Sequence, residues 1–148
     1  MDRLTKEYKA LVCSGWRLFT LSHRAWSREM ERHGLSPSTF PVVEMAVQQP
    51  GVTQQVIADA LSVDKSCVSR AVKHLEDAGF LLREKAGERT RGLCCYPTEK
   101  ARAAYEAIIA FEAKHIHALA GDVAPEKLAN ANASCIQLVE RLISDNDK

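Results

Sequence analysis

The sequence lacks the features that mark several common classes of protein. No apolar run in its 148 residues approaches the ~20 residues that a membrane-spanning helix requires. The charged start MDRLTKEYK is not followed by the apolar core of a signal peptide. Apolar content of 46% and charged content of 26% are ordinary for a soluble globular protein. We therefore expect a cytoplasmic protein that makes no contact with a membrane.

Paired cysteines and catalytic patterns are also missing from the sequence. The five cysteines include no CxxC pair, so neither a disulfide scaffold nor a zinc ribbon is predicted, and reduced thiols are expected. His115 and His117 are two residues apart, which on a helix separates them by about 200°, so we do not expect them to share a metal ion. There is no glycine-rich phosphate loop and no Ser/His/Asp or Cys/His set. No cofactor is predicted, and an enzyme is the weakest interpretation.

The net charge of +1 favours no particular partner, but its distribution along the chain is uneven. Residues 1–64 carry 7 basic and 7 acidic side chains, residues 65–102 carry 9 and 5, and residues 103–148 carry 4 and 7. The balances are therefore 0, +4 and −3. A basic middle block suggests a contact with a polyanion.

The stretch DKSCVSRAVKHLEDAGF, residues 64–80, opens this basic block and predicts a helix with two different faces. Val68, Val72 and Leu75 have the i, i+4, i+7 spacing of a buried stripe. Asp64 is expected to cap the first turn, and Gly79 suits the left-handed residue after a helix. The other face carries short hydroxyls and cations: Lys65, Ser66, Ser69, Arg70 and Lys73.

A second short helix precedes this one, and a hairpin follows it. The run TQQVIADAL predicts a helix whose Val56, Ile57, Ala58 and Leu61 face inward, and residues 62–63 form a tight turn. Two short helices joined in this way are the helix-turn-helix pattern. FLLREKA and LCCYPT then predict two strands joined by the charged loop GERTRG. A hairpin in this place predicts a winged helix.

Longer helices are predicted on both sides of the central unit. Residues 4–33 show apolar residues at alternating steps of four and three, the spacing of a helix-pairing seam. Further helices are expected over residues 40–49, from Thr98 to about Gly121, and from Pro125 onward. They carry more apolar surface than the central unit can cover. A two-fold homodimer through the chain ends is therefore predicted.

The predicted fold class is mainly α with a small β-hairpin wing, a winged helix-turn-helix flanked by N- and C-terminal dimerisation helices. We assign residues 1–34 and 122–148 to the helical dimerisation region. Residues 35–98 form the winged helix-turn-helix domain, and residues 99–121 form the connecting helix.

The run VTQQVIADALSVDKSCVSRAVKHLEDAGFLLRE, followed by GERTRG and PTEKARA, resembles the multiple-antibiotic-resistance regulator (MarR) family of bacterial transcription regulators. The resemblance covers nearly the whole chain. It implies a winged-helix homodimer that binds pseudo-palindromic double-stranded DNA, usually as a repressor, and that releases DNA when a small aromatic or phenolic ligand binds or a cysteine is oxidised. The family's wing usually carries an aspartate before its arginines, whereas this loop carries Glu88, and Arg91 is the best match to the wing arginine.

Ten residues are the candidate DNA contacts. Arg70 can form a forked pair with guanine, and the hydroxyls of Ser66 and Ser69 can bond phosphates or bases. Lysines suit phosphates, as does the N-terminus of the preceding helix. Glu76 and Asp77 are assigned instead to capping and solubility. The candidates are Thr53, Gln54, Gln55, Lys65, Ser66, Ser69, Arg70, Lys73, Arg89 and Arg91.

Candidate sensor residues lie mostly in the first long helix. An effector pocket in this fold would lie between the dimer helices and the winged unit, and the candidate lining residues are Trp16, His23, Trp26 and Phe40. An aromatic stripe of this kind is more often part of a core.

Cys13 lies roughly where the hydroperoxide-sensing branch of the family has its reactive cysteine, so it is the candidate redox residue, although most cysteines of this kind are buried and inert. Cys94 and Cys95 are adjacent on a strand, so we expect only one of them to be exposed.

Three functions remain open from the sequence. The first is a DNA-binding regulator, in most cases a repressor, released by a small aromatic ligand. The second is a DNA-binding repressor that senses oxidants through Cys13. The third is a winged helix that serves only protein association, which predicts no salt-dependent affinity for DNA.

Overall fold

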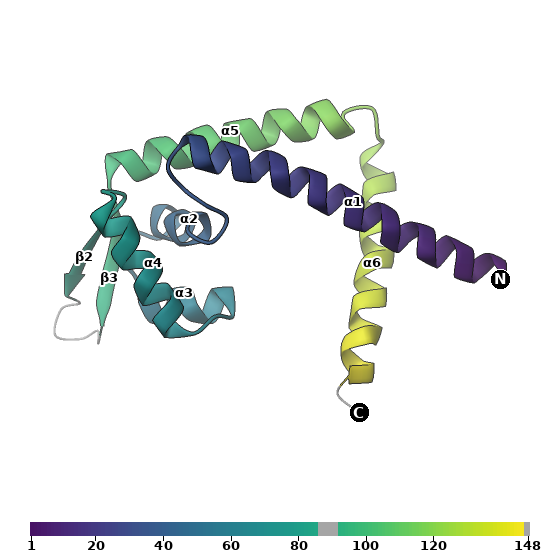
Figure 1. Cartoon of the computed structure of the whole chain (residues 1–148), viewed down its shortest axis with the longest axis horizontal. Helices are drawn as coiled ribbons and strands as arrows, with labels where there is room; N and C mark the ends of the chain where they lie inside the picture. The colour runs from purple at the N-terminus through teal and green to yellow at the C-terminus, as the bar shows by residue number, and fades with distance from the viewer. Residues whose placement is uncertain (86–91, 147–148) are drawn as a thin grey trace. The chain divides into compact units, whose positions relative to one another are not determined.

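The computed structural model describes residues 1–85 and 92–146, and within these ranges it contains six helices and three short strands (Figure 1). In chain order these are α1 (Arg3–Arg32), α2 (Phe40–Gln48), β1 (Val52–Thr53), α3 (Gln54–Leu61), α4 (Lys65–Asp77), β2 (Leu81–Lys85), β3 (Leu93–Pro97), α5 (Glu99–Ala120) and α6 (Pro125–Asn146). The mainly helical fold with a β-hairpin wing is confirmed. The chain divides into two compact units, Met1–Phe111 and Glu112–Lys148, which we describe separately.

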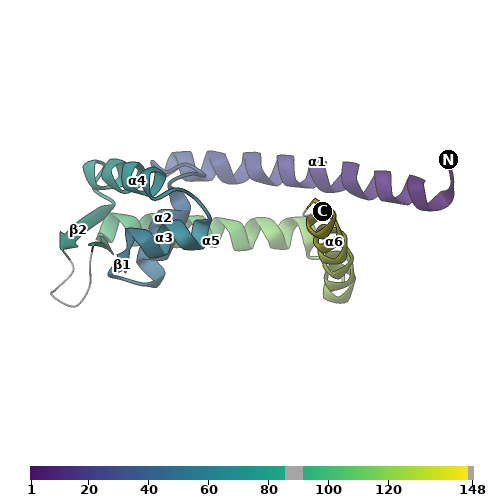
Figure 2. The ribbon, with the colours of Figure 1, turned by 90° about the horizontal axis from the view of Figure 1, so that it is seen from below.

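The first unit contains a three-stranded antiparallel sheet with the order β1-β3-β2. The hairpin of β2 and β3 was predicted, and it lies beside α4 (Figures 1 and 2). Strand β1 was not predicted, because a strand of two residues is too short to show an alternating pattern. It pairs Val52 with Cys95 and Thr53 with Cys94, so the segment before α3 is joined to the middle strand.

A single apolar core holds α2, α3, α4 and the sheet together. Val43, Ile57, Val72 and Leu81 have no exposed surface, and Leu75 is 1% exposed. The buried stripe predicted for α4 is confirmed, because Val68, Val72 and Leu75 all belong to this core. Burying a side chain of this size stabilises the folded state by about 1.5–3 kcal/mol.

Two expectations about burial are wrong. Val56 is 44% exposed and does not face inward, because the buried stripe of the short helix α3 is narrow and runs through Ile57 and Ala58. Cys94 and Cys95 are both buried, whereas one was expected to be exposed. They belong to β3, the middle strand of the sheet, which also contacts helices α2 and α3.

Helices α1 and α4 end in the same way. Gly79 follows α4 with φ +78°, and the Gly79 and Phe80 amides donate to the carbonyls of Glu76 and Leu75 at 2.9 and 2.8 Å. This is the Schellman arrangement, in which a left-handed residue lets the chain turn back and satisfy the last carbonyls. Gly34 does the same for α1 with φ +75°. The predicted role of Gly79 is confirmed.

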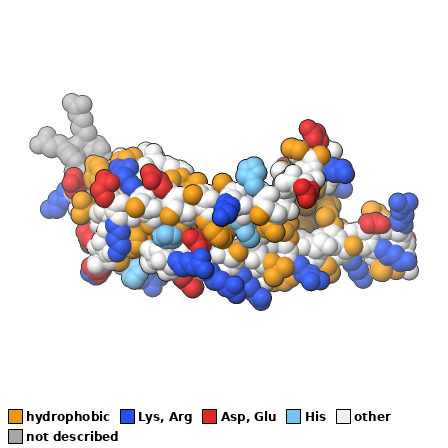
Figure 3. All heavy atoms as spheres, turned by 90° about the horizontal axis from the view of Figure 1, so that it is seen from above, with side chains coloured by type: hydrophobic (Ala, Val, Ile, Leu, Met, Phe, Trp, Pro, Cys, Tyr) orange, Lys and Arg blue, Asp and Glu red, His pale blue; other side chains and the backbone are white. Residues whose placement is uncertain are grey.

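Much of α1 and all the described part of α6 present apolar side chains to the outside. In α1 the exposed set is Leu4, Tyr8, Leu11, Val12, Trp16, Leu18, Phe19 and Leu21. In α6 it is Leu128, Ile136, Val139, Leu142 and Ile143. Hydrophobic side chains are visible among the basic and acidic ones on the face shown in Figure 3. The assignment of residues 1–34 and 122–148 to a dimerisation region stays a prediction.

None of the helices in the described ranges combines the length and hydropathy that crossing a membrane requires.

Candidate nucleic-acid interface

Helix α4 presents the polar face that the sequence predicted. Lys65, Ser66, Arg70 and Lys73 are exposed, and Ser69 is half-buried. The opposite face is anchored in the core through its valines and leucine. A helix with one face fixed in this way holds the other face in a constant orientation, which a surface that reads a partner requires.

The start of α4 is fixed by backbone bonds more than by its cap residue. Asp64 occupies the N-cap position, and its carbonyl accepts the Cys67 and Val68 amides at 2.9 and 3.3 Å. Its carboxylate makes no capping bond to the described part of the chain, so the prediction that it would cap the first turn is wrong. Ser62 has φ +53°, a left-handed conformation that turns the chain sharply between α3 and α4.

The cationic side chains Arg70 and Lys73 of α4 contact different partners. Arg70 Nη2 donates to Cys67 Sγ at 3.3 Å, one turn earlier in the helix. Lys73 Nζ lies 3.5 Å from Asp77 Oδ2, and both side chains are about two-thirds exposed. Exposed pairs of this kind contribute little to stability, so Lys73 can exchange Asp77 for another anion at small cost.

The start of α3 was the second predicted contact region. Thr53 Oγ1 accepts the Val56 amide at 3.3 Å and caps the helix, and Gln55 Nε2 donates to Asp59 Oδ1 at 2.8 Å. Gln54 is only 6% exposed, so its side chain is not available at the surface, but the prediction for this helix start rested on backbone N–H groups and stays a prediction. Its side chain packs inward because Gln54 opens α3 beside the core residue Ile57; only its backbone N–H remains a candidate contact.

The C-terminal end of α4 is tied to β2 by an ion pair that sequence reasoning missed. Arg83 Nε donates to Glu76 Oε2 at 2.7 Å, and Arg83 Nη2 bonds the same oxygen. The hydrogen bond from Arg83 lowers the pKa of Glu76, which had been assigned to capping and solubility. The two residues are seven apart and come from different elements, so no helical spacing reveals the pair.

The start of α5 also anchors α4. Thr98 Oγ1 donates to the Gly79 carbonyl at 2.8 Å and accepts the Ala101 amide at 3.3 Å, which confirms Thr98 as the cap. Lys100 Nζ donates to the Ala78 carbonyl at 2.8 Å and lies 4.3 Å from the ring centre of Phe80. A lysine at the carbonyl end of a helix also interacts favourably with the helix dipole. The C-terminal end of α4 is thus tied to both β2 and α5.

The predicted wing arginines, Arg89 and Arg91, lie outside the described residues. Strands β2 and β3, from which the wing extends, are described on both sides of that segment.

The four candidate effector residues are not brought together in a cavity of the described chain. Trp16 is 69% exposed, and His23 is exposed with its ring 5.5 Å from that of Phe19. Phe40 is a core residue, 7% exposed, whose ring stacks on Tyr105 at 6.2 Å. Trp26 is half-buried, and its Nε1 has no partner within the described residues. The role of these residues in a pocket stays a prediction.

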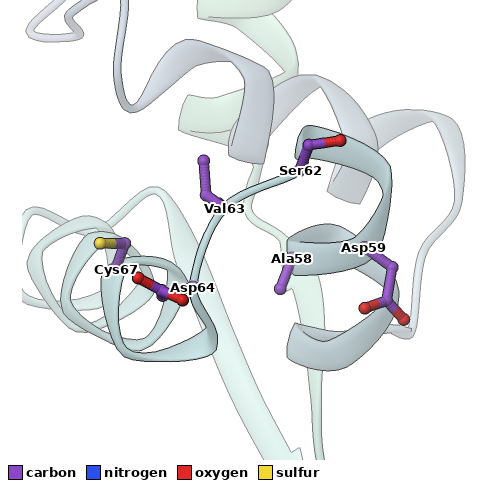
Figure 4. Close-up of a pocket in the computed structure, with 6 residues that line it drawn as sticks. All are labelled: Ala58, Asp59, Ser62, Val63, Asp64 and Cys67. Carbon is purple, nitrogen blue, oxygen red and sulfur yellow. The ribbon is translucent and has the colours of Figure 1, made fainter. Parts of the chain in front are cut away.

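Two hollows border α4 instead. The first is shallow, about 700 Å³, and lies where α3 ends and α4 begins (Figure 4). Its wall includes Asp59 and Ser62 from the α3 side, and Asp64 and Cys67 from the α4 side. The second is a more apolar groove of about 560 Å³ between α4 and the segment that begins α2, and Cys67 lines this one too.

The cysteines fall into two groups by environment. Cys13, Cys67 and Cys135 are exposed, whereas burial raises the pKa of the Cys95 thiol to about 11, with a smaller contribution from Cys94. A buried thiol of this kind stays protonated and unreactive at neutral pH. Within the described residues, no three histidine, cysteine or acidic side chains gather in a way that could hold a metal ion.

Two curated proteins are similar to part of the chain. The uncharacterized HTH-type transcriptional regulator YybA of Bacillus subtilis (strain 168) is 30% identical over 82 residues, 54% of this chain and 54% of that protein. A Thauera aromatica protein, named as a transcriptional regulatory protein for the hcr operon, is 28% identical over 65 residues, 44% of this chain and 39% of that protein. The chain thus spans about half or less of the length of these relatives.

Solved structures share the fold over more of the chain. A MarR family transcription regulator covers 97% of both chains with a TM-score of 0.82 and 21% identity. The MepR–DNA complex of S. aureus covers 86% of this chain and 93% of that one, with a TM-score of 0.70 and 19% identity. CouR of Rhodococcus jostii RHA1, bound to p-coumaroyl-CoA, covers 83% and 86%, with a TM-score of 0.65 and 22% identity.

The sequence model of the MarR family matches residues 33–92, from the end of α1 to the start of β3. This segment contains α2, β1, the helix-turn-helix of α3 and α4, and β2. Residues 33–92 therefore match the MarR family, and the chain shares the fold of a MarR family transcription regulator over nearly its whole length.

Proposed function

We propose that this protein is a transcription regulator that binds double-stranded DNA by placing α4 in the major groove. The observation that carries the proposal is the outer face of α4, which holds Lys65, Ser66, Arg70 and Lys73 on a helix anchored to the core, to β2 and to α5. Short side chains near the N-terminus let the helix approach the bases closely. A helix that only faced solvent would not need to be held in place by this many contacts.

The four side chains take different roles. Arg70 is the residue that reads sequence, because a guanidinium can pair with both acceptors of guanine, a contact that discriminates by about 1–3 kcal/mol. Lys65 and Lys73 bind phosphates, where a point charge suffices. The backbone amides at the start of α3, beside Thr53 and Gln55, offer a second phosphate contact. The MepR–DNA complex, which shares the fold, supports this mode of binding.

The test is fluorescence-anisotropy binding to a duplex from the upstream region of the protein's own gene, measured across a salt series. Arg70→Ala is expected to lower affinity for the specific site by roughly 5- to 150-fold, the equivalent of about 1–3 kcal/mol, with little change on unrelated DNA. Lys73→Ala is expected to weaken binding to both duplexes and to reduce the salt slope by about 1.

Arg32→Ala serves as the control, because Arg32 is also an exposed arginine, at the end of α1, where it pairs with Glu29. It is expected to bind like the wild type. Unchanged specific affinity of Arg70→Ala would remove Arg70 from the interface. Absence of any salt-dependent affinity would favour the protein-association function instead.

We also propose that the protein acts as a homodimer on a pseudo-palindromic site. The support is the set of apolar side chains exposed along α1 and, in the other unit, along α6, since soluble monomers rarely expose large contiguous apolar patches. A two-fold dimer would present two copies of α4 to two half-sites. Sedimentation equilibrium should give twice the chain mass of 16.4 kDa, and a monomer at all concentrations would contradict the proposal.

The regulation that we propose is repression relieved by a small aromatic or phenolic effector. CouR with p-coumaroyl-CoA shows a protein of this fold with an aromatic acyl ligand, and Trp16, His23, Trp26 and Phe40 are the candidate contacts here. Titration of aromatic carboxylates into the protein–DNA complex should release DNA. The alternative is redox sensing through Cys13, which is exposed. A peroxide response that persists in Cys13→Ser would exclude it.

A further inference from the structure

Helix α1 is strongly basic, although the charges of the first 64 residues balance. All seven basic residues of that part of the chain lie in α1, whereas only three of its seven acidic residues do. Residues 8–28 carry four basic side chains and no acidic one. Seven basic against three acidic residues give α1 a balance of +4, which equals that of the block containing α4.

Three arginines form a stripe along one face of α1. Arg17, Arg24 and Arg28 are spaced by seven and then four residues, which on a helix places them within about 40° of one another. All three are exposed, and together they span about 16 Å of helix at a rise of 1.5 Å per residue. Basic side chains follow the edge along which α1 runs in Figure 3. We call these three residues the arginine stripe.

The arginine stripe is not neutralised by the protein itself. Within the described residues none of its three guanidinium groups forms an ion pair, whereas Arg32, at the end of the same helix, pairs with Glu29. Arg24 and Arg28 are four residues apart, an arrangement of like charges that destabilises a helix. A surface that serves only solubility is better built from interspersed charges of both signs. The stripe therefore indicates an anionic partner.

The arginine stripe opens toward the same side as the polar face of α4. Figure 2 shows α1 and α4 along one side of the first unit and α5 along the other. Helix α4 packs against α2, α3 and β2 through its apolar face. In α1 the residues that pack against the core are Trp26 and Met30, which lie on the side of the helix opposite the stripe. Both polar surfaces are thus turned away from the same core.

We propose that the arginine stripe of α1 is a second DNA-backbone site, which binds phosphates of the duplex beyond the base pairs that α4 reads. This inference rests on the proposed DNA-binding function. Duplex DNA carries one negative charge per about 1.7 Å of its axis, so a cationic row of about 16 Å meets several phosphates. Contacts to phosphates position a protein and strengthen its binding, but they carry no sequence information. The stripe adds affinity, and α4 reads the sequence.

The arginine stripe also stays accessible in the proposed homodimer. Tyr8, Leu11 and Phe19 are exposed apolar residues of α1, and each lies at least about 100° around the helix from the three arginines. A second copy of the chain that covers this apolar face leaves the opposite face open. One helix can therefore serve the dimer with one face and DNA with the other.

The first experiment measures anisotropy across a salt series, with a duplex from the upstream region of the protein's own gene and with an unrelated duplex. The stripe variant combines Arg17→Gln, Arg24→Gln and Arg28→Gln. Its salt slope should fall by about 1 for each lost phosphate contact, hence by about 3 per bound chain. The advantage of the wild type should shrink roughly 40-fold per bound chain between 50 and 200 mM salt. Both duplexes should lose affinity alike, unlike the loss expected for Arg70→Ala.

Two control variants separate the position of the charges from their number. Lysine at all three stripe positions should restore the slope, because a point charge suffices for a phosphate. Lys114→Gln, Lys127→Gln and Arg141→Gln together remove three positive charges from exposed positions of α5 and α6, and this variant should keep a slope near that of the wild type. An equal loss of slope in the two glutamine variants would overturn the proposal.

Failure of the stripe and failure of the proposed function give different results. An unchanged slope in the stripe variant, while Arg70→Ala still weakens specific binding, would overturn the stripe alone. Absence of salt-dependent binding by the wild type on either duplex would overturn both.

The second experiment locates the contacts by ethylation interference on the upstream duplex, which identifies the phosphates whose modification prevents binding. The stripe variant should lose a set of interfering phosphates different from the set lost in Lys73→Ala, and identical sets would contradict a second site. Sedimentation equilibrium of the stripe variant should give the association state of the wild type. A weakened association would assign the arginines to contacts between copies of the chain and overturn the proposal.

Discussion

The winged-helix segment and the long terminal helices use the same residue types in opposite ways. In the segment formed by α2, α3, α4 and the sheet, most valine, isoleucine and leucine side chains are buried, with Val56 and Leu82 among the exceptions. In α6 the same residue types are about half exposed, and no side chain among those described in that helix is buried. Both regions have amphipathic helices, so amphipathicity alone does not tell which helices complete their own core.

The winged-helix segment and the terminal helices differ in how many contacts hold each helix in place. Helix α4 is held by apolar contacts, by the Glu76–Arg83 pair and by bonds from Thr98 and Lys100. Most helical stability in proteins comes from such packing of the apolar face, not from intrinsic propensity. A helix whose apolar face is not packed in this way needs another apolar surface to cover that face. In the proposed dimer, the second copy of the chain supplies this surface.

The largest expected effect comes from truncating the core of the winged-helix segment. Leu75→Ala should lower the free energy of unfolding by about 2–5 kcal/mol, because it opens a cavity around a side chain that is 1% exposed. Leu142→Ala removes the same atoms from a side chain that is 55% exposed. The effect of each variant is measured as the loss of hydrogen-exchange protection at the α4 and β3 amides, and Leu142→Ala is expected to cause the smaller loss. An equal loss in the two variants would contradict the contrast between the two regions.

The second effect concerns association. The double change Leu142→Lys with Ile143→Lys should weaken dimerisation by at least about 100-fold, since each apolar side chain contributes about 1.5–3 kcal/mol when fully buried and about 1.4 kcal/mol is tenfold. Sedimentation equilibrium measures the dissociation constant. Glu140→Lys, on the same helix, is the control for added positive charge. A dimer unaffected by the double change would place the dimer interface elsewhere.

A smaller effect is expected at the junction of α4 and α5. Thr98→Val keeps the shape of the side chain but removes its bond to the Gly79 carbonyl and its cap on Ala101. The loss should be about 1–2 kcal/mol in urea-induced unfolding, the range of a lost helix cap. Thr98→Ser, which retains the hydroxyl, should recover most of it. If Thr98→Ser were as unstable as Thr98→Val, the hydroxyl would not be the stabilising group.

Thr53 and Asp64 both occupy N-cap positions, but only the Thr53 side chain makes a capping hydrogen bond. Thr53 caps α3 through its hydroxyl, so Thr53→Ala should cost about 1 kcal/mol. The Asp64 carboxylate makes no capping bond within the described chain, so Asp64→Ala should stay within about 0.5 kcal/mol. Thermal unfolding of the two variants side by side tests this order. The reverse order would contradict the geometry at the start of α4.

The smallest expected effect is a change in how the free energy of unfolding depends on pH. The pKa of Glu76 is lowered by Arg83, so the pair's contribution is fully present above the ordinary glutamate value of 4.5. It is lost as the pH falls through the lowered folded-state value, because the carboxylate must then be protonated. Glu76→Gln should therefore be slightly less stable than the wild type at neutral pH, should converge with it at acidic pH, and so should show a flatter acid limb of the unfolding profile. An identical acid limb in the variant would show that the pair does not contribute.

The sequence predicted the local elements well and the contacts between distant elements poorly. The bounds of α4, the hairpin and the cap at Thr98 follow from periodicity and turn residues, which are local signals. Strand β1, the burial of Gln54 and Cys94, and the Glu76–Arg83 pair depend on contacts between different elements, and a single sequence does not show which partner a residue meets. The exposure of Cys67 and the groove beside it are of this second kind.

The separation of the two faces of α4 has a consequence for how this protein can evolve. Lys65, Ser66 and Arg70 lie outside the core cluster, whereas Val68, Val72 and Leu75 belong to it. Under the proposed DNA-binding function, exchanges at the first three positions can therefore alter which operator is preferred while the folding stability stays nearly constant. Duplicated copies of such a gene could acquire new target sites through a few substitutions, with no need for compensating changes in the scaffold.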